Sequence, residues 1–176
     1  KYTALTNVTL PSSLTTIKAN AFNGCTALTN ITLPQSLVTI ERSAFNNCTS
    51  LEIEDLSLPN LETLGSGAFN RVKISKISNL GKITAVNPEN WNGENLGDKS
   101  VLREITLPNT LKTIGSNTFS GYTALETITI ESGASGINVG AGAFSRLPSL
   151  TTFNVDPDAF ISLGSNAFNG ISIWNE

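Results

Sequence analysis

The sequence predicts a mainly β solenoid of about seven to eight stacked repeats of about 23 residues each. The first observation is the internal repeat itself, whose fullest copy reads LTNITLPQSLVTIERSAFNNCTS from Leu28 to Ser50. The second is an aromatic residue that recurs near the middle of every copy. The third is a composition that is 39% hydrophobic, only 14% charged and rich in Thr, Asn, Ser and Gly. A repeat this short cannot bury its own apolar face, so the copies must stack on one another.

The aromatic residues align the repeats. They fall at intervals of 23, 24, 22, 28, 25 and 24 residues, as Phe22, Phe45, Phe69, Trp91, Phe119, Phe144 and Phe168. An aliphatic residue precedes each of them by five positions, as Ile17, Ile40, Leu64, Val86, Ile114, Val139 and Leu163. Because this spacing never changes, we expect the variation in length to fall mostly in the turn-forming stretches that are rich in Gly, Asn, Ser, Pro and Asp.

Each repeat begins with a predicted strand of the pattern L-x-x-I-x-L. The second repeat supplies Leu28, Ile31 and Leu33, and the third is aligned as Ile53, Leu56 and Leu58, with the alternation of two that is typical of a strand. Proline follows the strand in four copies, where it favours a corner, at Pro11, Pro34, Pro59 and Pro108. Parallel rungs about 4.8 Å apart would make a rod about 35 Å long.

Two further segments complete the predicted repeat. The β-branched stretch after the corner, such as Ser13–Ile17, is expected to be extended on the opposite wall. The A-F-x-G-C stretch, such as Ala21–Cys25, is expected to form a single 3₁₀ or α turn.

The combined pattern I-x-L-P-x-x-L-x-x-I-x-x-x-A-F-x-x-C-x-x-L resembles the BspA-like (Treponema pallidum type) leucine-rich repeat family. The resemblance covers the whole chain, with the best agreement in residues 5–50 and 102–130. It implies a right-handed solenoid with a parallel sheet on its concave face. It also implies a cell-surface or secreted protein of a host-associated bacterium, a role in adhesion or protein binding, and no catalytic residues.

The chain is expected to be a single repeat domain, residues 1–176, that starts and stops inside repeats. Its first five residues, Lys1 to Leu5, match the interior of a later repeat at Gly121 to Leu125. We therefore expect further repeats or domains on at least one side. An irregular repeat spans about residues 74–101 and carries an insertion at Glu94–Ser100, following Trp91. Loops on a rigid scaffold often carry binding residues, although an ordinary tolerated insertion is the simpler interpretation.

Composition excludes several classes of function. Eleven basic and fourteen acidic residues give a net charge of −3 and no cationic stripe for nucleic acid. The longest apolar runs are far shorter than the roughly 20 residues that span a bilayer. The chain has no histidine, so a Ser-His-Asp triad and the commonest transition-metal ligand are absent. Carboxylate pairs such as Glu54 with Glu126, or Asp55 with Glu104, remain conceivable for glycoside hydrolysis, but an open sheet lacks the burial that tunes such groups.

The two cysteines, Cys25 and Cys48, occupy the same position in successive repeats. Other repeats place Val72, Leu147 or Ile171 there, which indicates a core position. In-register side chains do not point at each other as a disulfide requires, so we expect buried free thiols. Two cysteines without histidine do not complete a zinc site, and no cofactor or metal is expected.

The strongest candidate for binding is a group of charges on the predicted concave sheet. The outward positions of the strands form columns that are mostly Thr, Asn and Ser at the two ends of the chain. In the middle repeats they carry both charge signs, at Glu54, Asp55, Lys76, Arg103, Glu104 and Glu126. These charges either pair across strands and keep the sheet from aggregating, or form a recognition patch for a partner.

These observations favour a non-enzymatic, monomeric module that binds a host extracellular or bacterial surface protein through the concave face. One alternative is a structural spacer that projects another domain. Another is a glycan-binding module, which the few aromatics besides phenylalanine (Tyr2, Trp91, Tyr122 and Trp174) disfavour.

Overall fold

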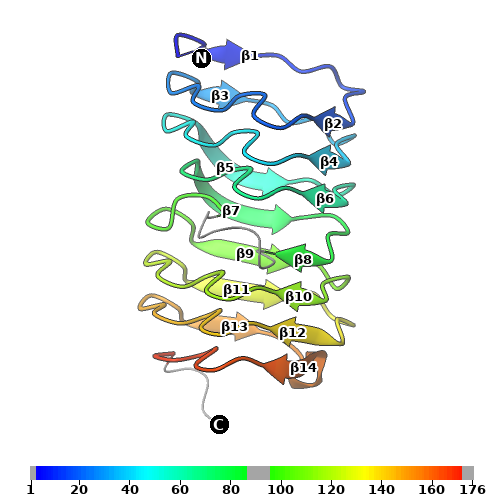
Figure 1. The fold of residues 1–176 in the computed structure, drawn as a ribbon, viewed down its shortest axis with the longest axis vertical. Helices are drawn as coiled ribbons and strands as arrows, with labels where there is room; N and C mark the ends of the chain where they lie inside the picture. Colours follow the sequence, from blue (N-terminus) through cyan, green and yellow to red (C-terminus); the bar gives the residue numbers. More distant parts are fainter. Residues whose placement is uncertain (1–2, 87–95, 172–176) are drawn as a thin grey trace.

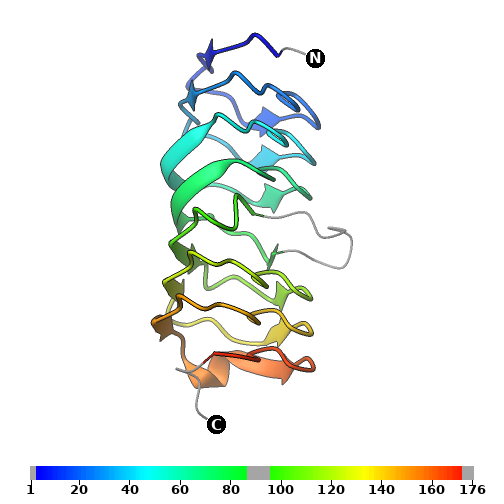
Figure 2. The same cartoon turned by 90° about the vertical axis from the view of Figure 1, so that its left-hand side faces the viewer.

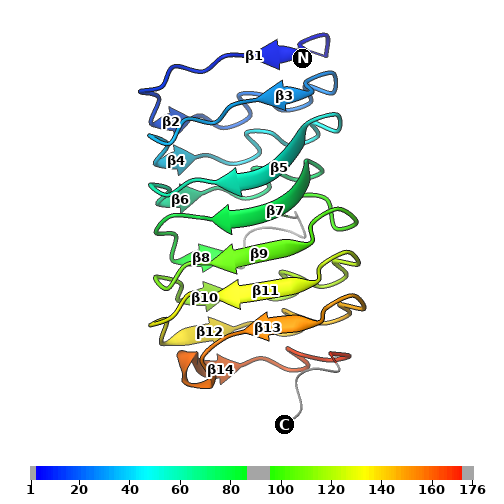
Figure 3. The ribbon, with the colours of Figure 1, turned by 180° about the vertical axis from the view of Figure 1, so that it is seen from behind.

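A computed structural model describes residues 3–86 and 96–171. Within these ranges the chain forms a stack of rungs, each contributing one strand to each of two walls (Figures 1 and 3). The rungs follow one another in chain order along the long axis, as the side view also shows (Figure 2). A mainly β parallel solenoid with a repeat of about 23 residues is therefore confirmed.

The first wall carries the strands that the L-x-x-I-x-L pattern predicts. They are β1 (Asn7–Val8), β3 (Asn30–Ile31), β5 (Glu52–Ser57), β7 (Lys73–Asn79), β9 (Glu104–Leu107), β11 (Thr127–Ile130) and β13 (Thr152–Asn154). Strands β5, β7, β9, β11 and β13 form one parallel sheet, while β1 and β3 form a separate pair. This wall is therefore interrupted between β3 and β5.

The second wall carries the predicted second extended segments. They are β2 (Thr16–Ile17), β4 (Thr39–Ile40), β6 (Thr63–Leu64), β8 (Ala85–Val86), β10 (Thr113–Ile114), β12 (Ile137–Val139) and β14 (Phe160–Leu163), preceded by the 3₁₀ helix η1 (Pro157–Ala159). They form one sheet of β2, β4 and β6 and another of β8, β10, β12 and β14. Aliphatic residues from both walls and the phenylalanines fill the single core between them.

The phenylalanines stack one above another along the core. The ring centroids of Phe22 and Phe45 are 5.0 Å apart and those of Phe45 and Phe69 are 5.3 Å apart, with planes within 6°. Phe144 continues a second stack, 5.5 Å from Phe119 and 5.2 Å from Phe168. Such spacings follow from the distance between parallel strands. Trp91, expected between the two stacks, lies outside the described residues.

The A-F-x-G-C stretches form single turns closed by i→i+3 hydrogen bonds, as expected, but these turns do not continue as a helix. Alternate N–H groups there donate to the next rung: Phe22 donates to Ala44 at 2.8 Å, whereas Cys25 closes a local turn to Phe22 at 3.1 Å. A helix would keep all of these donors within its own segment. The residues two positions before and after each phenylalanine of the two stacks have positive φ, such as Asn20 at 59° and Gly24 at 75°. Glycine and asparagine tolerate this conformation best, which explains their recurrence.

The alignment of the third repeat also needs correction. Leu51, which is fully buried, is equivalent to Leu28, the first leucine of the L-x-x-I-x-L pattern. The Glu52 N–H accordingly donates to the Thr29 carbonyl, at 3.5 Å. Ile53, which the sequence alignment placed there, lies inside a longer strand. The third repeat therefore has two extra residues within β5 itself rather than in a loop.

Neighbouring rungs approach each other closely at a glycine after the second-wall strand. A Cβ on Gly140 would lie 2.4 Å from the backbone nitrogen of Ser116, and one on Gly164 would meet Ala141 at the same distance. We expect Gly140→Ala to lower the free energy of unfolding by about 1–3 kcal/mol, because rigid backbone must move apart to admit the methyl group. Urea denaturation measures the change.

The exposed neighbour Ala141 provides the control, since Ala141→Ser should change stability by no more than about 0.5 kcal/mol. Equal stability of Gly140→Ala and the parent chain would contradict the close packing of the rungs at this corner.

Candidate functional site

The central strands of the first wall bring the predicted charged residues together. The ladder pairs Asp55 with Lys76, Lys76 with Glu104, and Glu104 with Thr127. Backbone bonds align the neighbouring column, because Arg103 N donates to Ser75 O and Glu126 N donates to Arg103 O. We call the exposed side of β5, β7, β9 and the start of β11 the charged face. It comprises Glu52, Glu54, Asp55, Lys73, Lys76, Arg103, Glu104 and Glu126.

Three ion pairs connect adjacent rungs of the charged face. Lys73 Nζ lies 2.8 Å from Glu52 Oε1, and Lys76 Nζ lies 2.8 Å from Glu104 Oε2. Arg103 donates to Glu126 at 2.6 Å. Between 43% and 69% of the surface of each of these side chains is exposed to solvent. Each pair therefore contributes less than about 1 kcal/mol to stability.

Two of these pairs shift pKa values in the direction of the charged forms. The hydrogen bond from Lys73 lowers the pKa of Glu52, and the hydrogen bond to Glu104 raises the pKa of Lys76. Both shifts favour the charged forms of Glu52 and Lys76 near neutral pH, and the paired residues of the face alternate in sign. This pairing matches the cross-strand interpretation, and it leaves the charged groups accessible to a partner.

Sequence alignment missed Glu52 and Lys73, because it excluded the two extra residues of β5 from the columns. The motif E-I-E-D facing K-I-S-K, with glutamate and lysine at matched positions, was the available signal. The register between β5 and β7 shifts after Leu56, so Ser57 pairs with Asn79 rather than with Ser78. This shift leaves the Ser78 N–H outside the ladder, and it donates instead to Asp55 Oδ1 at 3.1 Å.

Glu54 differs from the rest of the charged face. It is exposed, and within the described ranges no hydrogen bond or ion pair engages its carboxylate. Five carboxylates and three cations give the face a formal charge of −2, and the unbalanced part lies at Glu54 and Asp55 on β5. The charged face is therefore acidic at its N-terminal margin and balanced elsewhere.

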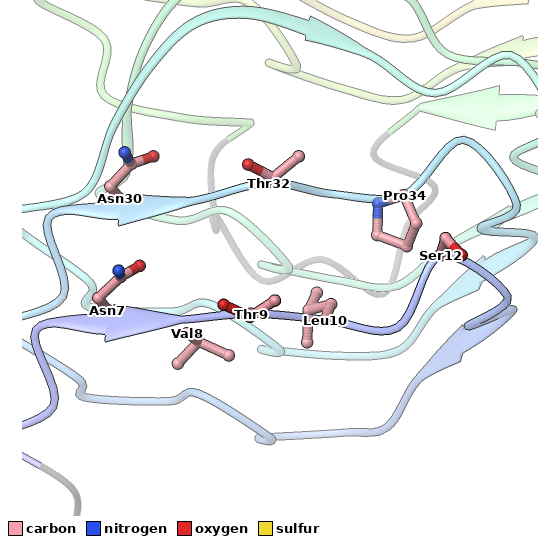
Figure 4. A pocket seen from close by; sticks show the side chains of 8 residues that line it. All are labelled: Asn7, Val8, Thr9, Leu10, Ser12, Asn30, Thr32 and Pro34. Carbon is pink, nitrogen blue, oxygen red and sulfur yellow. The ribbon is translucent and has the colours of Figure 1, made fainter.

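Two open hollows lie beside β3, on either side of the residues that continue this strand. One, of about 400 Å³, lies along the first two rungs and is lined by Asn7, Val8, Thr9, Leu10, Ser12, Asn30, Thr32 and Pro34 (Figure 4). The other, of about 240 Å³, lies at the interruption of the first wall and is lined by Ile31, Thr32, Leu33, Gln35, Ile53, Asp55, Leu56 and Ser57. Asp55 joins the second hollow to the charged face.

Neither carboxylate pair considered for hydrolysis is set up for acid–base catalysis. Glu104 and Glu126 each bind a cation, and all four carboxylates lie on an open sheet rather than in a desolvated pocket. Within residues 3–86 and 96–171, no three Cys, Asp or Glu side chains gather as metal ligands. The same residues include no helix long and apolar enough to cross a bilayer.

The end of the insertion is anchored to the core by Tyr122. The phenol is fully buried, and its oxygen accepts a hydrogen bond from Leu96 N at 2.8 Å. Lys99 lies 5.5 Å from the centre of the same ring and donates to Ser120 O at 2.7 Å. Burial lowers the pKa of the Lys99 amine and raises that of the Tyr122 phenol. Tyr122 is therefore not an exposed platform for sugars. The rest of the insertion, with Trp91, lies outside the described residues, as do Tyr2 and Trp174.

Both cysteines are buried and free, as expected. The Cys48 thiol donates to the Phe22 carbonyl at 3.1 Å. Burial raises the pKa of Cys48 to about 11 and raises that of Cys25 in the same direction. The cysteines are therefore inert core residues in the neutral pH range.

The raised thiol pKa predicts a loss of stability in alkali. The unfolded chain releases the Cys48 proton near its ordinary pKa of 9.0, whereas the folded chain holds it to about 11. Stability is therefore complete below pH 9 and falls as the pH rises toward 11. Urea denaturation from pH 8 to 10.5 should show a smaller fall for Cys48→Val, which copies Val72 of the next repeat. An identical pH dependence in the two chains would contradict the buried thiol.

The Tyr122 hydrogen bond predicts that Tyr122→Phe lowers the free energy of unfolding by about 1–3 kcal/mol, because the buried Leu96 N–H loses its acceptor. Hydrogen exchange at the Leu96 amide should accelerate. As a control, Ser100→Ala removes only an exposed contact to Asp98 and should change stability by less than about 0.5 kcal/mol. Unchanged exchange at Leu96 would mean that Tyr122 does not anchor the insertion.

Comparison with known proteins gives one family and two similar folds. A family model described as the BspA type leucine rich repeat region matches residues 1–97 and 94–176, in six copies. A search of curated proteins found no match.

Two solved structures are similar to the chain. A leucine-rich repeat protein from Bacteroides ovatus is 19% identical, with a TM-score of 0.44, and the match covers 94% of this chain and 64% of that one. A leucine rich cell surface protein from Faecalibacterium prausnitzii is 23% identical, with a TM-score of 0.47, and covers 94% and 45%. The chain thus spans less than two thirds of the length of either protein.

Proposed function

Because the chain belongs to the BspA-type leucine-rich repeat family, we propose that it is a non-enzymatic protein-interaction module that binds its partner through the charged face. The family and the solenoid fold are typically non-enzymatic, and leucine-rich repeats commonly mediate protein interactions. The partner is a protein on a host extracellular surface or a bacterial surface, and the module works at the cell surface or after secretion. The name of the Faecalibacterium protein agrees with this location.

The observation that carries the proposal is the restriction of charge to four successive rungs of one sheet. On the outward side of the first wall, rungs one and two offer neutral residues such as Asn7 and Asn30, and the last rung offers Thr152. Every rung from β5 to β11 contributes at least one charged side chain. Charged groups held on a rigid sheet can select a partner by complementary charge and speed its encounter.

The ion pairs are compatible with binding. Each pair is half exposed and contributes little to folding, so a partner can add hydrogen bonds to the same carboxylates or exchange with one member of a pair. Because the strands hold these side chains in fixed register, their spacing is set before the partner arrives. Such preorganisation reduces the entropy that binding must overcome.

Charge reversal at the centre of the face tests the proposal. The double variant Lys76→Glu and Arg103→Glu should reduce partner capture from host extracellular extract, or from bacterial surface extract, at least tenfold, because each new carboxylate faces Glu104 or Glu126. The thermal midpoint should move by only a few degrees, since the pairs lost are surface pairs. Quantitative mass spectrometry of captured proteins measures the effect.

The matched control is Arg42→Glu with Lys82→Glu, which makes the same change in net charge at exposed residues outside the charged face. Capture that survives reversal at Lys76 and Arg103 would exclude the charged face as the binding surface. A structural spacer would capture nothing with any of the three chains. Capture that a simple sugar competes away would favour the glycan-binding alternative.

A further inference from the structure

The first wall opens between β3 and β5. Among the described residues, one backbone hydrogen bond spans this gap, from Glu52 N to Thr29 O at 3.5 Å. The other links use side chains: Gln35 Nε2 donates to Ser57 O at 3.2 Å, and Asn60 Nδ2 donates to Gln35 O at 3.0 Å. The two extra residues of β5 explain the gap, because β5 and β7 follow a register that β3, with two residues, does not match. Side-chain hydrogen bonds therefore take the place of the backbone ladder between β3 and β5.

The hollow at this gap joins apolar and acidic surface. Its apolar lining residues are Ile31, Leu33, Ile53 and Leu56, and of these Leu33 and Ile53 are only partly buried. Asp55 also lines it, and Glu54 precedes Asp55 in the chain. The neighbouring hollow of Figure 4 differs, because none of its lining residues is charged.

The hollow has room for a single side chain. Its volume is about 240 Å³. A leucine or isoleucine side chain fits such a space, whereas a helix or a folded loop does not. The hollow can therefore act as the anchor point of a larger contact.

The negative charge of Glu54 and Asp55 determines which residue of the partner can lie beside the aliphatic side chain in the hollow. The cations of the charged face are engaged with Glu52, Glu104 and Glu126. Glu54 and Asp55 form no ion pair among the described residues, although Lys76, which binds Glu104, faces Asp55 across the ladder. This margin therefore keeps an excess of negative charge, which a basic residue next to the anchoring side chain would complement.

We infer that the hollow between β3 and β5 is the anchor site of the partner, and that it takes an aliphatic side chain adjacent to a lysine or arginine on a protein segment. The inference rests on the proposed function and adds the chemistry of the partner. The aliphatic group covers Leu33 and Ile53, while the cation binds Asp55 and Glu54. The rest of the partner then extends over the ion pairs of β7, β9 and β11.

The test uses blocked peptides as probes and the methyl groups of Ile31 and Ile53 as reporters. We expect acetyl-Gly-Leu-Arg-Gly-amide to shift both methyl signals in NMR titrations, with a dissociation constant on the order of 1 mM, as suits one anchor on an open surface. Acetyl-Gly-Leu-Glu-Gly-amide and acetyl-Gly-Gly-Arg-Gly-amide should each bind at least fivefold more weakly. Binding should weaken as salt rises from 50 to 500 mM.

Matched variants locate the site. Glu54→Gln with Asp55→Asn should weaken the arginine peptide at least fivefold, whereas Glu62→Gln, at an exposed carboxylate beside β6, should not. Thr32→Phe should block the hollow, while Thr106→Phe, placed on β9 in the unbroken part of the sheet, should leave binding intact. Heteronuclear spectra verify that each variant is folded.

Absence of methyl shifts at 10 mM peptide would overturn the inference, as would equal binding of the arginine and glutamate peptides or shifts that centre on the hollow of Figure 4. Failure of the inference is distinguishable from failure of the proposed function. Reversal of Lys76 and Arg103 changes no residue that lines the hollow, and Thr32→Phe changes no member of the ion pairs. Partner capture that depends on the first pair but not on Thr32 would keep the charged face and remove the anchor.

Discussion

The distance between neighbouring rungs is the constraint on which the rest of this molecule depends. Parallel strands must lie about 4.8 Å apart to form their hydrogen bonds. The phenylalanine rings consequently stack at 5.0 to 5.5 Å, and the backbone at Gly140 and Gly164 comes too close to the preceding rung for a side chain. The surface residues of a repeat can therefore vary freely, whereas the spacing between neighbouring rungs cannot.

The same constraint governs the turns around the stacked phenylalanines. Its alternate N–H groups bond to the next rung, and this requires residues of positive φ on both sides of each phenylalanine. A continuous helix would satisfy all of these donors locally and leave the carbonyls of the neighbouring rung without them. Glycine and asparagine at these positions are therefore part of the stacking geometry, and so are Cys25 and Cys48, whose thiols fill core space.

The functional surface arises where the repeat departs from this regularity. Two extra residues in β5, matched by a longer β7, add the pair of Glu52 and Lys73 and separate β5 from β3. The longer strands thus produce both the extended charged face and the hollow beside it. An insertion in a loop would have produced neither, because the ladder between the strands would have remained continuous.

The sequence by itself determined the architecture, because a core position repeated at fixed spacing has one physical explanation. It located the two walls, the stacked phenylalanines, the buried cysteines and the column that joins Asp55, Lys76 and Glu104. Tertiary structure decided the rest. The position of the extra residues within β5, the bonding of the turns between rungs and the attachment of Leu96 to Tyr122 all depend on which backbone group faces which neighbour. These features depend on which hydrogen bonds form between neighbouring rungs. The sequence of a single repeat does not specify those bonds.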